Sequence, residues 1–152
     1  MLTARVTVPV PCERAFATLA DGWLYASWVV GASHIRRVDP DWPAVGSRIH
    51  YSVGLWPVLI RDTTVVRSVE GPHRLELEAR LWSLGSAGIR LTLTETQPGY
   101  TTIEMVERAI SGPGHLVPGP AQDLLFAARN QESLNRLAAL IIARDGRPRP
   151  DH

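Results

Sequence analysis

Strict alternation of apolar and polar residues dominates the middle of the chain. From Ser33 to Ile110 nearly every second residue of successive short segments is hydrophobic, a period of two that is typical of strands with one buried face. Short connections rich in glycine and proline separate these segments and favour turns. The predicted strands are 33–39, 47–53, 58–69, 73–82, 88–96 and 100–110.

The two ends of the chain follow other patterns. Residues 2–8 alternate in the same way and predict a first strand, whereas 9–22 and 22–31 predict two short helices. After a glycine- and proline-rich connection, 121–143 predicts one long amphipathic helix, because its apolar residues recur at intervals of three and four. That apolar stripe consists of Leu124, Ala128, Leu134, Leu137, Ala138 and Ile141.

These elements predict an α+β fold. Short connections between consecutive strands indicate an antiparallel meander, here a seven-stranded curved sheet, and the long helix must bury its stripe across one face of it. The length of 152 residues suits one domain with a sizeable core. We expect that domain at residues 1–145, followed by a flexible polar tail at 146–152.

Four segments stand out within this order of elements: "DGWLYASWVVGAS", "DPDWPAVGSRIHYSVGLWP", "MVERAISGPG" and "RNQESLNRLA". With these residues, the order of a strand, two short helices, six strands and a long helix resembles the helix-grip fold of the START-like, or SRPBCC, superfamily. The chain is most similar to the polyketide cyclase/dehydrase-type and lipid-transport-type members. This resemblance implies a cavity between the sheet and the long helix of a ligand-binding domain.

Composition removes several classes of function. A formal net charge of +1, without lysine and without a basic run, gives no electrostatic case for nucleic acid. No apolar run of membrane-spanning length appears. The single cysteine, Cys12, excludes an internal disulfide and favours a cytoplasmic location. The five histidines are scattered, so we expect neither a metal nor another cofactor.

Strand phase identifies the candidate site. In the last strand Glu107 shares its phase with Ile103, Met105 and Ala109, so it faces inward and needs a partner or a purpose. The same reasoning places further residues on the inner side, with Glu76, Glu78 and Arg80 on the outer side. The predicted ligand-binding residues there are Tyr51, Ile60, Asp62, Thr64, Leu77, Ala79, Leu91, Met105 and Glu107.

The long helix and the connection before it complete the predicted site. Asn130 and Ser133 share one helix face and can reach either the cavity or a strand carbonyl. Arg129 and Arg136 are alternative countercharges for Glu107. The connection 111–120, with His115 and Leu116 at its centre, is either a gate to the cavity or a plain connector.

Two functions from different classes fit this pattern. The first is a module that binds a small hydrophobic ligand, such as a lipid, polyketide or isoprenoid-like compound, without altering it. The second is a polyketide cyclase/dehydratase-type enzyme in which Glu107 or Asp62, with Tyr51, moves protons. In a purely structural alternative both carboxylates pair with arginine or with backbone groups. Oligomeric state and ligand identity lie beyond the sequence.

Overall fold

The computed structural model describes residues 3–55, 58–80, 85–112 and 119–145. Strands account for most of the described residues before the last helix, as the alternation predicts. The elements are β1 (Ala4–Val8), α1 (Cys12–Leu19), the 3-10 helix η1 (Gly22–Leu24), α2 (Tyr25–Trp28), β2 (Ala32–Val38), β3 (Arg48–Leu55), β4 (Val58–Glu70), β5 (Arg74–Arg80), β6 (Ser86–Gln97), β7 (Tyr100–Ser111) and α3 (Gly119–Asp145).

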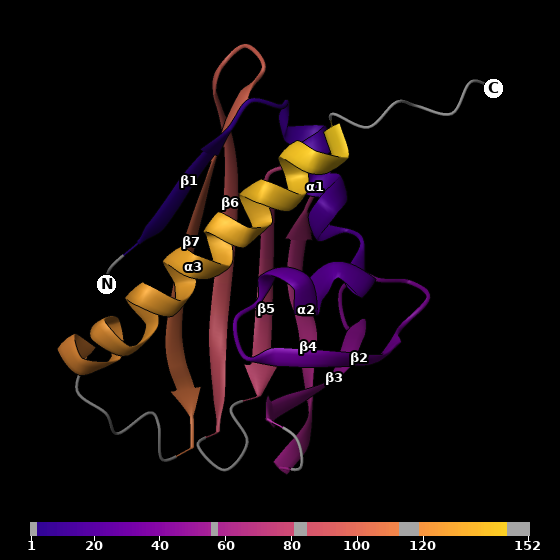
Figure 1. Ribbon diagram of the computed structural model, residues 1–152, viewed down its shortest axis with the longest axis vertical. Coiled ribbons are helices and arrows are strands. Elements are labelled where there is room, and N and C mark those ends of the chain that lie inside the picture. Colours follow the sequence, from indigo (N-terminus) through magenta and orange to yellow (C-terminus); the bar gives the residue numbers. More distant parts are fainter. Residues whose placement is uncertain (1–2, 56–57, 81–84, 113–118, 146–152) are drawn as a thin grey trace.

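All strands join one antiparallel sheet in the order β1-β7-β6-β5-β4-β3-β2 (Figure 1). Strands β2 to β7 form the predicted meander, and β1 pairs with β7, Ala4 lying opposite Met105. The β6–β7 turn contains Pro98 and then Gly99, whose φ of 81° is one that a glycine adopts without strain. The predicted α+β fold is therefore confirmed.

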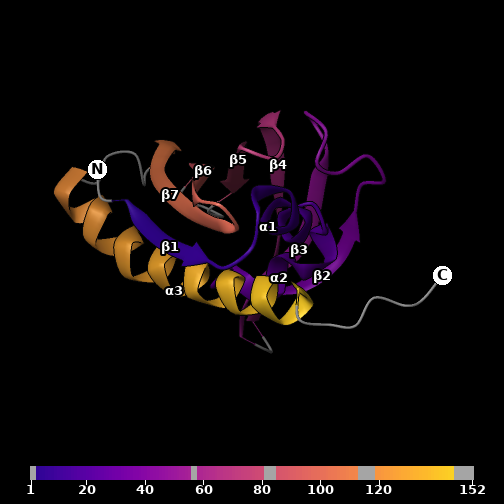
Figure 2. The ribbon, with the colours of Figure 1, turned by 90° about the horizontal axis from the view of Figure 1, so that it is seen from above.

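The sheet curves around its helices. Figure 2 shows α3 lying along the concave side, with α1 and α2 inside the curve beside it. Helix α3 packs against β1, β7, α1 and α2. Its residues Leu134, Leu137 and Ile141 are buried there, each contributing about 1.5–3 kcal/mol of hydrophobic stabilisation.

The predicted stripe of α3 is wrong over its first turns. Leu124 is 75% exposed and Ala128 is also exposed. The physical reason is visible in Figure 1, where the beginning of α3 lies beside the edge of the sheet and not over it. Only the second half of the stripe therefore packs against the interior.

Alternation correctly predicts the buried side chains of β5, β6 and β7, whereas on β3 Ser52, predicted to face outward, is buried and Val53 is only half-buried. On β5, Leu75, Leu77 and Ala79 are buried, whereas Glu76 and Glu78 are half-buried on the other side. Ile89, Leu91 and Leu93 of β6 and the inward residues of β7 are likewise buried. We call the side covered by α3 the inner face and the opposite side the outer face.

The short helical region differs from its prediction. The segment 22–31 forms η1 and one turn of α2, and the helix ends at Trp28 because Val29 is extended, with φ −80° and ψ 113°. The tail 146–152 lies outside the described residues, so the predicted domain limit stays a prediction. None of the described helices is both long enough and apolar enough to cross a membrane.

One side chain of α3 also contacts the edge of the sheet. The amide of Gln131 donates a hydrogen bond from Nε2 to the Arg5 carbonyl at 2.9 Å, and its Oε1 accepts one from the Arg5 backbone N–H at 3.4 Å. Strand β1 is an edge strand, so these backbone groups have no neighbouring strand on that side. Gln131 thus takes the place of a strand partner at this point.

Candidate functional site: the polar end of the interior

The interior changes in character along the strands. Large apolar side chains fill one end, where Leu91 pairs in register with Met105 and with Leu75. Toward the end where β7 leads into α3, small residues take over. Ala87 lies opposite both Ala79 of β5 and Ala109 of β7. The inner face therefore has a row of three small side chains, and Thr64 lies opposite Ala79 at one end of it.

A chain of three hydroxyl groups lies beside this row. The Thr64 Oγ1 atom is 2.8 Å from the Tyr25 hydroxyl and 3.1 Å from the Tyr51 hydroxyl, both within hydrogen-bond distance. All three residues are buried, and the two tyrosine rings contact each other with centroids 5.3 Å apart. Burial raises the pKa of both tyrosines, most strongly that of Tyr25. These hydroxyls therefore remain neutral donors and acceptors.

Glu107 meets an arginine from α3. The Nη2 atom of Arg129 donates hydrogen bonds to both carboxylate oxygens of Glu107, at 2.6 and 2.7 Å. The Glu107 side chain is fully buried, whereas that of Arg129 is 31% exposed. Arg129 is thus the countercharge, and Arg136 instead pairs with Glu132 on the surface. The predicted inward direction of Glu107 is correct.

The ion pair does not fully offset the burial of Glu107. Desolvation raises the pKa of this carboxyl, while the Arg129 charge and hydrogen bonds from Arg129 and Asn130 lower it, leaving the pKa above its usual value. Electrostatic influence from Glu107 and Arg129 also extends to Tyr25. We define the polar end of the interior as Tyr25, Tyr51, Thr64, Glu107, Arg129 and Asn130.

Two atoms at the polar end have no hydrogen-bond partner within the described residues. They are the Nε atom of Arg129, a donor, and the Oδ1 atom of Asn130, an acceptor, and both atoms are buried. Only 4% of the Asn130 surface is exposed. Leaving such groups unpaired costs about 1–3 kcal/mol each, so this end of the interior retains unused polar capacity.

Asp62 occupies a different setting. Its Oδ1 atom accepts a hydrogen bond from the Thr63 backbone N–H at 3.0 Å and lies 3.7 Å from Nε of Arg80. The residue is buried directly opposite Tyr51 in the β3–β4 register. These contacts give Asp62 backbone and ionic partners of the ordinary structural kind.

The structure brings together only part of the predicted site. Tyr51, Thr64, Glu107 and Asn130 lie at the polar end, whereas Leu91 and Met105 belong to the apolar packing. Ser133 is used structurally, since its Oγ accepts a hydrogen bond from the Val30 backbone N–H at 3.1 Å. The predicted positions that are buried on the inner side or on α3 are Tyr51, Asp62, Thr64, Leu77, Ala79, Leu91, Met105, Glu107 and Asn130.

Three predicted site residues lie outside what the structure describes. The backbone of Ile60 belongs to β4, but its side chain is outside the described residues. His115 and Leu116 fall in the segment 113–118, which is also outside them. The predicted gate therefore stays a prediction.

Sequence reasoning missed Tyr25. It lies on a helix of one turn, Tyr25–Trp28, which is too short for a period of 3.6 to indicate which side faces inward. A usable signal was its place in "GWLYASWVVG", where it is the one aromatic residue with a hydroxyl. Buried tyrosines usually find a hydrogen-bond partner, and here that partner is Thr64.

The described residues do not build a metal centre. Among them, no group of three or more His, Cys, Asp or Glu side chains is placed to hold a metal ion. His50, for example, lies 3.3 Å from Asp39 through Nε2, and the same Asp39 carboxylate accepts the Arg48 backbone N–H. This pair connects β3 to the loop before it.

Comparison with known proteins agrees with the fold. The solved structures that share it include protein NE0264 from Nitrosomonas europaea (15% identity, TM-score 0.68, 96% of each chain covered). They also include an AHSA1-like protein from Aeromonas hydrophila (18% identity, TM-score 0.66, 99% of each chain). A third is the di-domain ARO/CYC BexL from the BE-7585A biosynthetic pathway, at 14% identity and TM-score 0.63, covering 98% of this chain and 50% of that one.

The sequence itself supplies the family. No curated protein sequence matches the chain, but residues 1–141 match the profile of the family described as polyketide cyclase / dehydrase and lipid transport. That match spans all seven strands of the sheet and most of α3, including Glu107, Arg129 and Asn130. The chain therefore belongs to the polyketide cyclase/dehydrase and lipid transport family.

Proposed function

We propose that the protein binds a small hydrophobic molecule, such as a lipid, polyketide or isoprenoid-like compound, between the sheet and α3. The observation that carries this proposal is the pair of buried, unpartnered polar atoms, Arg129 Nε and Asn130 Oδ1, beside the alanine row. A ligand with an apolar body would cover the alanines. Its hydroxyl or carbonyl group would satisfy the donor or the acceptor.

The hydroxyl chain supports the same function. Tyr25, Thr64 and Tyr51 contribute neutral groups whose hydrogens can reorient. A neutral polar lining selects a ligand by the position of its oxygen atoms and not by charge, since the Glu107 and Arg129 charges already oppose each other. We expect an uncharged polar group on the ligand and a cytoplasmic site of action, without a cofactor.

Native mass spectrometry of the purified protein tests this function. We expect a co-purified species above the mass of the chain that disappears after extraction with organic solvent. Asn130→Ala should lower its occupancy, because the variant lacks the buried acceptor. Asn135→Ala on the exposed side of α3 is the matched control and should retain it. Equal occupancy in both variants, or an empty protein that ignores a panel of lipids and polyketides, would refute the proposal.

An enzyme of the cyclase/dehydratase type is the second candidate. The raised pKa of Glu107, caused chiefly by burial, favours it, because a carboxyl group that binds its proton more tightly serves as an acid or base nearer neutral pH. The Arg129 contact makes Glu107 a better candidate for binding than for proton transfer. Turnover of poly-β-ketone mimics by the wild type and by Glu107→Gln, Asp62→Asn and Tyr51→Phe tests the enzymatic function. Unchanged turnover in all three variants would exclude it.

A further inference from the structure

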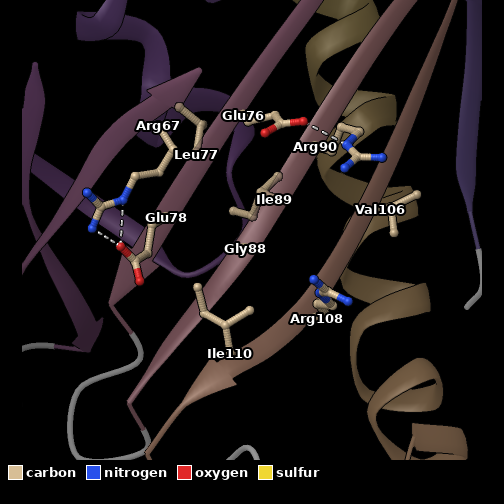
Figure 3. Close-up of a pocket in the computed structure, with 10 residues that line it drawn as sticks. All are labelled: Arg67, Glu76, Leu77, Glu78, Gly88, Ile89, Arg90, Val106, Arg108 and Ile110. Carbon is tan, nitrogen blue, oxygen red and sulfur yellow. Dashed lines mark hydrogen bonds and ion pairs between the residues drawn. The ribbon is translucent and has the colours of Figure 1, made fainter. Parts of the chain in front are cut away.

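The outer face of the sheet has its own hollow, separate from the interior. It has a volume of about 620 Å³ and lies over β4 to β7, within the range of about 300–1,000 Å³ of small-molecule sites. Figure 3 shows its lining, in which the pairs Arg67–Glu78 and Glu76–Arg90 are joined and Arg108 stands apart from both. A second hollow of about 370 Å³ shares Arg67 and Glu78 with it.

Charge on this face is unbalanced. Within the described part of the chain, the guanidinium groups of Arg48, Arg61 and Arg108 have no hydrogen-bond or ion-pair partner. All three lie in outward positions of β3, β4 and β7. Inside the hollow Glu76 and Glu78 are each taken by another arginine, so the positive charge of Arg108 is the excess.

The floor of the hollow is a glycine. Gly88 lies directly between Glu78 of β5 and Arg108 of β7 in the register. It is at an outward position of β6, on the same face as Arg90. A glycine inside a strand weakens it and often marks the close approach of a ligand. A Cβ atom here would meet Ile110 at 3.6 Å, an ordinary contact, so packing does not require the glycine.

The rim beside Arg108 is apolar. Val106 and Ile110 flank it along β7, and Ile110 is 39% exposed. A free guanidinium offers a planar fork of donors that suits a carboxylate or phosphate. The aliphatic side chains next to it suit the hydrocarbon portion of the same molecule.

We propose that this outer hollow, centred on Arg108 and Gly88, is a second binding site that takes a small organic anion with an apolar body. The anionic group, a carboxylate or phosphate, is held by Arg108 above Gly88, and its apolar body lies against Val106 and Ile110. The site is independent of the interior, because the sheet separates the two. It takes a charged ligand, whereas the interior pairs its own charges.

NMR titration of the ¹⁵N-labelled protein tests the site with octanoate and octyl phosphate, using octanol as the uncharged control. Both anions should shift the amide signals of Gly88, Arg108 and Ile110, and octanol should not. Arg108→Gln should weaken octanoate binding about tenfold. Arg61→Gln removes an equally unpaired arginine from the same face, outside both hollows, and should leave binding within about twofold.

Other outcomes overturn the site. If shifts occur only at amides of the helices beneath the sheet, such as those of Tyr25 and Asn130, or if Arg61→Gln and Arg108→Gln weaken binding equally, there is no outer site. Vesicles of phosphatidylglycerol identify the source of the anion. Vesicle binding lost in Arg108→Gln alone assigns a lipid headgroup to the site, whereas equal loss in both variants indicates a diffuse membrane contact and refutes it. Failure of the outer site leaves interior occupancy, measured by mass spectrometry, unaffected.

Discussion

Glu107 and Arg108 are neighbours in β7 whose side chains lie on opposite sides of the sheet. Glu107 is buried beneath α3, where it accepts hydrogen bonds from Arg129, and Arg108 is exposed on the outer face without a partner in the described residues. Because successive side chains of a strand point to opposite faces, a paired charge at Glu107 is followed directly by an unpaired one at Arg108. The two faces of the same strand therefore differ in the charge that they present.

Removing Arg129 should destabilise the fold. Arg129→Met leaves the Glu107 carboxylate buried without its countercharge, and such a loss typically costs about 3 kcal/mol. Urea unfolding at neutral pH measures the change. The double variant Glu107→Met/Arg129→Met should cost less than the sum of the two single variants, because it leaves no buried charge without a partner. Additive losses would mean that the pair has no energetic coupling.

The pH dependence of stability should carry the signature of Glu107. Its pKa is raised above the ordinary value of 4.5, so as pH rises the unfolded chain loses this proton at a lower pH than the folded state does. This contribution is fully present below that ordinary value and is lost as pH rises through the folded pKa. Unfolding free energies between about pH 4 and 8 should therefore fall for the wild type relative to Glu107→Gln. A constant difference would contradict the raised pKa.

Thr64 should matter more than either tyrosine hydroxyl that contacts it. Thr64→Val keeps the shape but leaves the buried Tyr25 and Tyr51 hydroxyls without a shared partner, at a cost of about 2 kcal/mol. Tyr51→Phe removes one contact only and should cost less. Thr63→Val, on the outer face, is the matched control and should stay within about 0.5 kcal/mol. Thermal melting ranks the three variants. A similar loss of stability for Thr63→Val would mean that the hydrogen bonds of Thr64 do not stabilise the fold more than an outer threonine does.

Gly88→Ala should preserve stability or raise it, while it adds one methyl group to the floor of the outer hollow. Gly88 does not have a positive φ and its added Cβ meets only Ile110 at an ordinary distance. The variant should gain up to about 1 kcal/mol from reduced entropy of the unfolded chain. Gly99→Ala is the contrasting variant, since its φ of 81° makes alanine cost about 1 kcal/mol or more. Chemical denaturation compares them, and a clear loss in Gly88→Ala would mean that packing needs the glycine.

Much of the fold follows from local pattern. The period of two identifies the buried set of β5, β6 and β7 because each strand is covered on one face only, and the same phase correctly places Glu107 inside. Short glycine- and proline-rich turns imply the meander. The start of α3 was predicted less well, since an apolar stripe does not reveal where a helix passes beyond the sheet and leaves Leu124 exposed.

The candidate site was harder to predict, because contacts between distant segments leave no local mark. Arg129 and Arg136 lie on the same predicted helix, and the sequence does not distinguish them as countercharges for Glu107. Only the path of α3 across the sheet brings Arg129 to this carboxylate. The outer hollow depends on Gly88 lying between Glu78 and Arg108 across three strands. Alternation assigns all three residues to the outside, but register alone aligns them.

The contact between Gln131 and the Arg5 backbone bears on how the sheet ends. An exposed edge strand is a template to which another chain can add, leading to aggregation. Gln131 occupies both backbone groups of Arg5 on β1, and at the other edge β2 has irregular register and carries Arg36 and Arg37. Each edge is thus made unsuitable for strand addition, one by a side-chain amide and the other by distortion and positive charge.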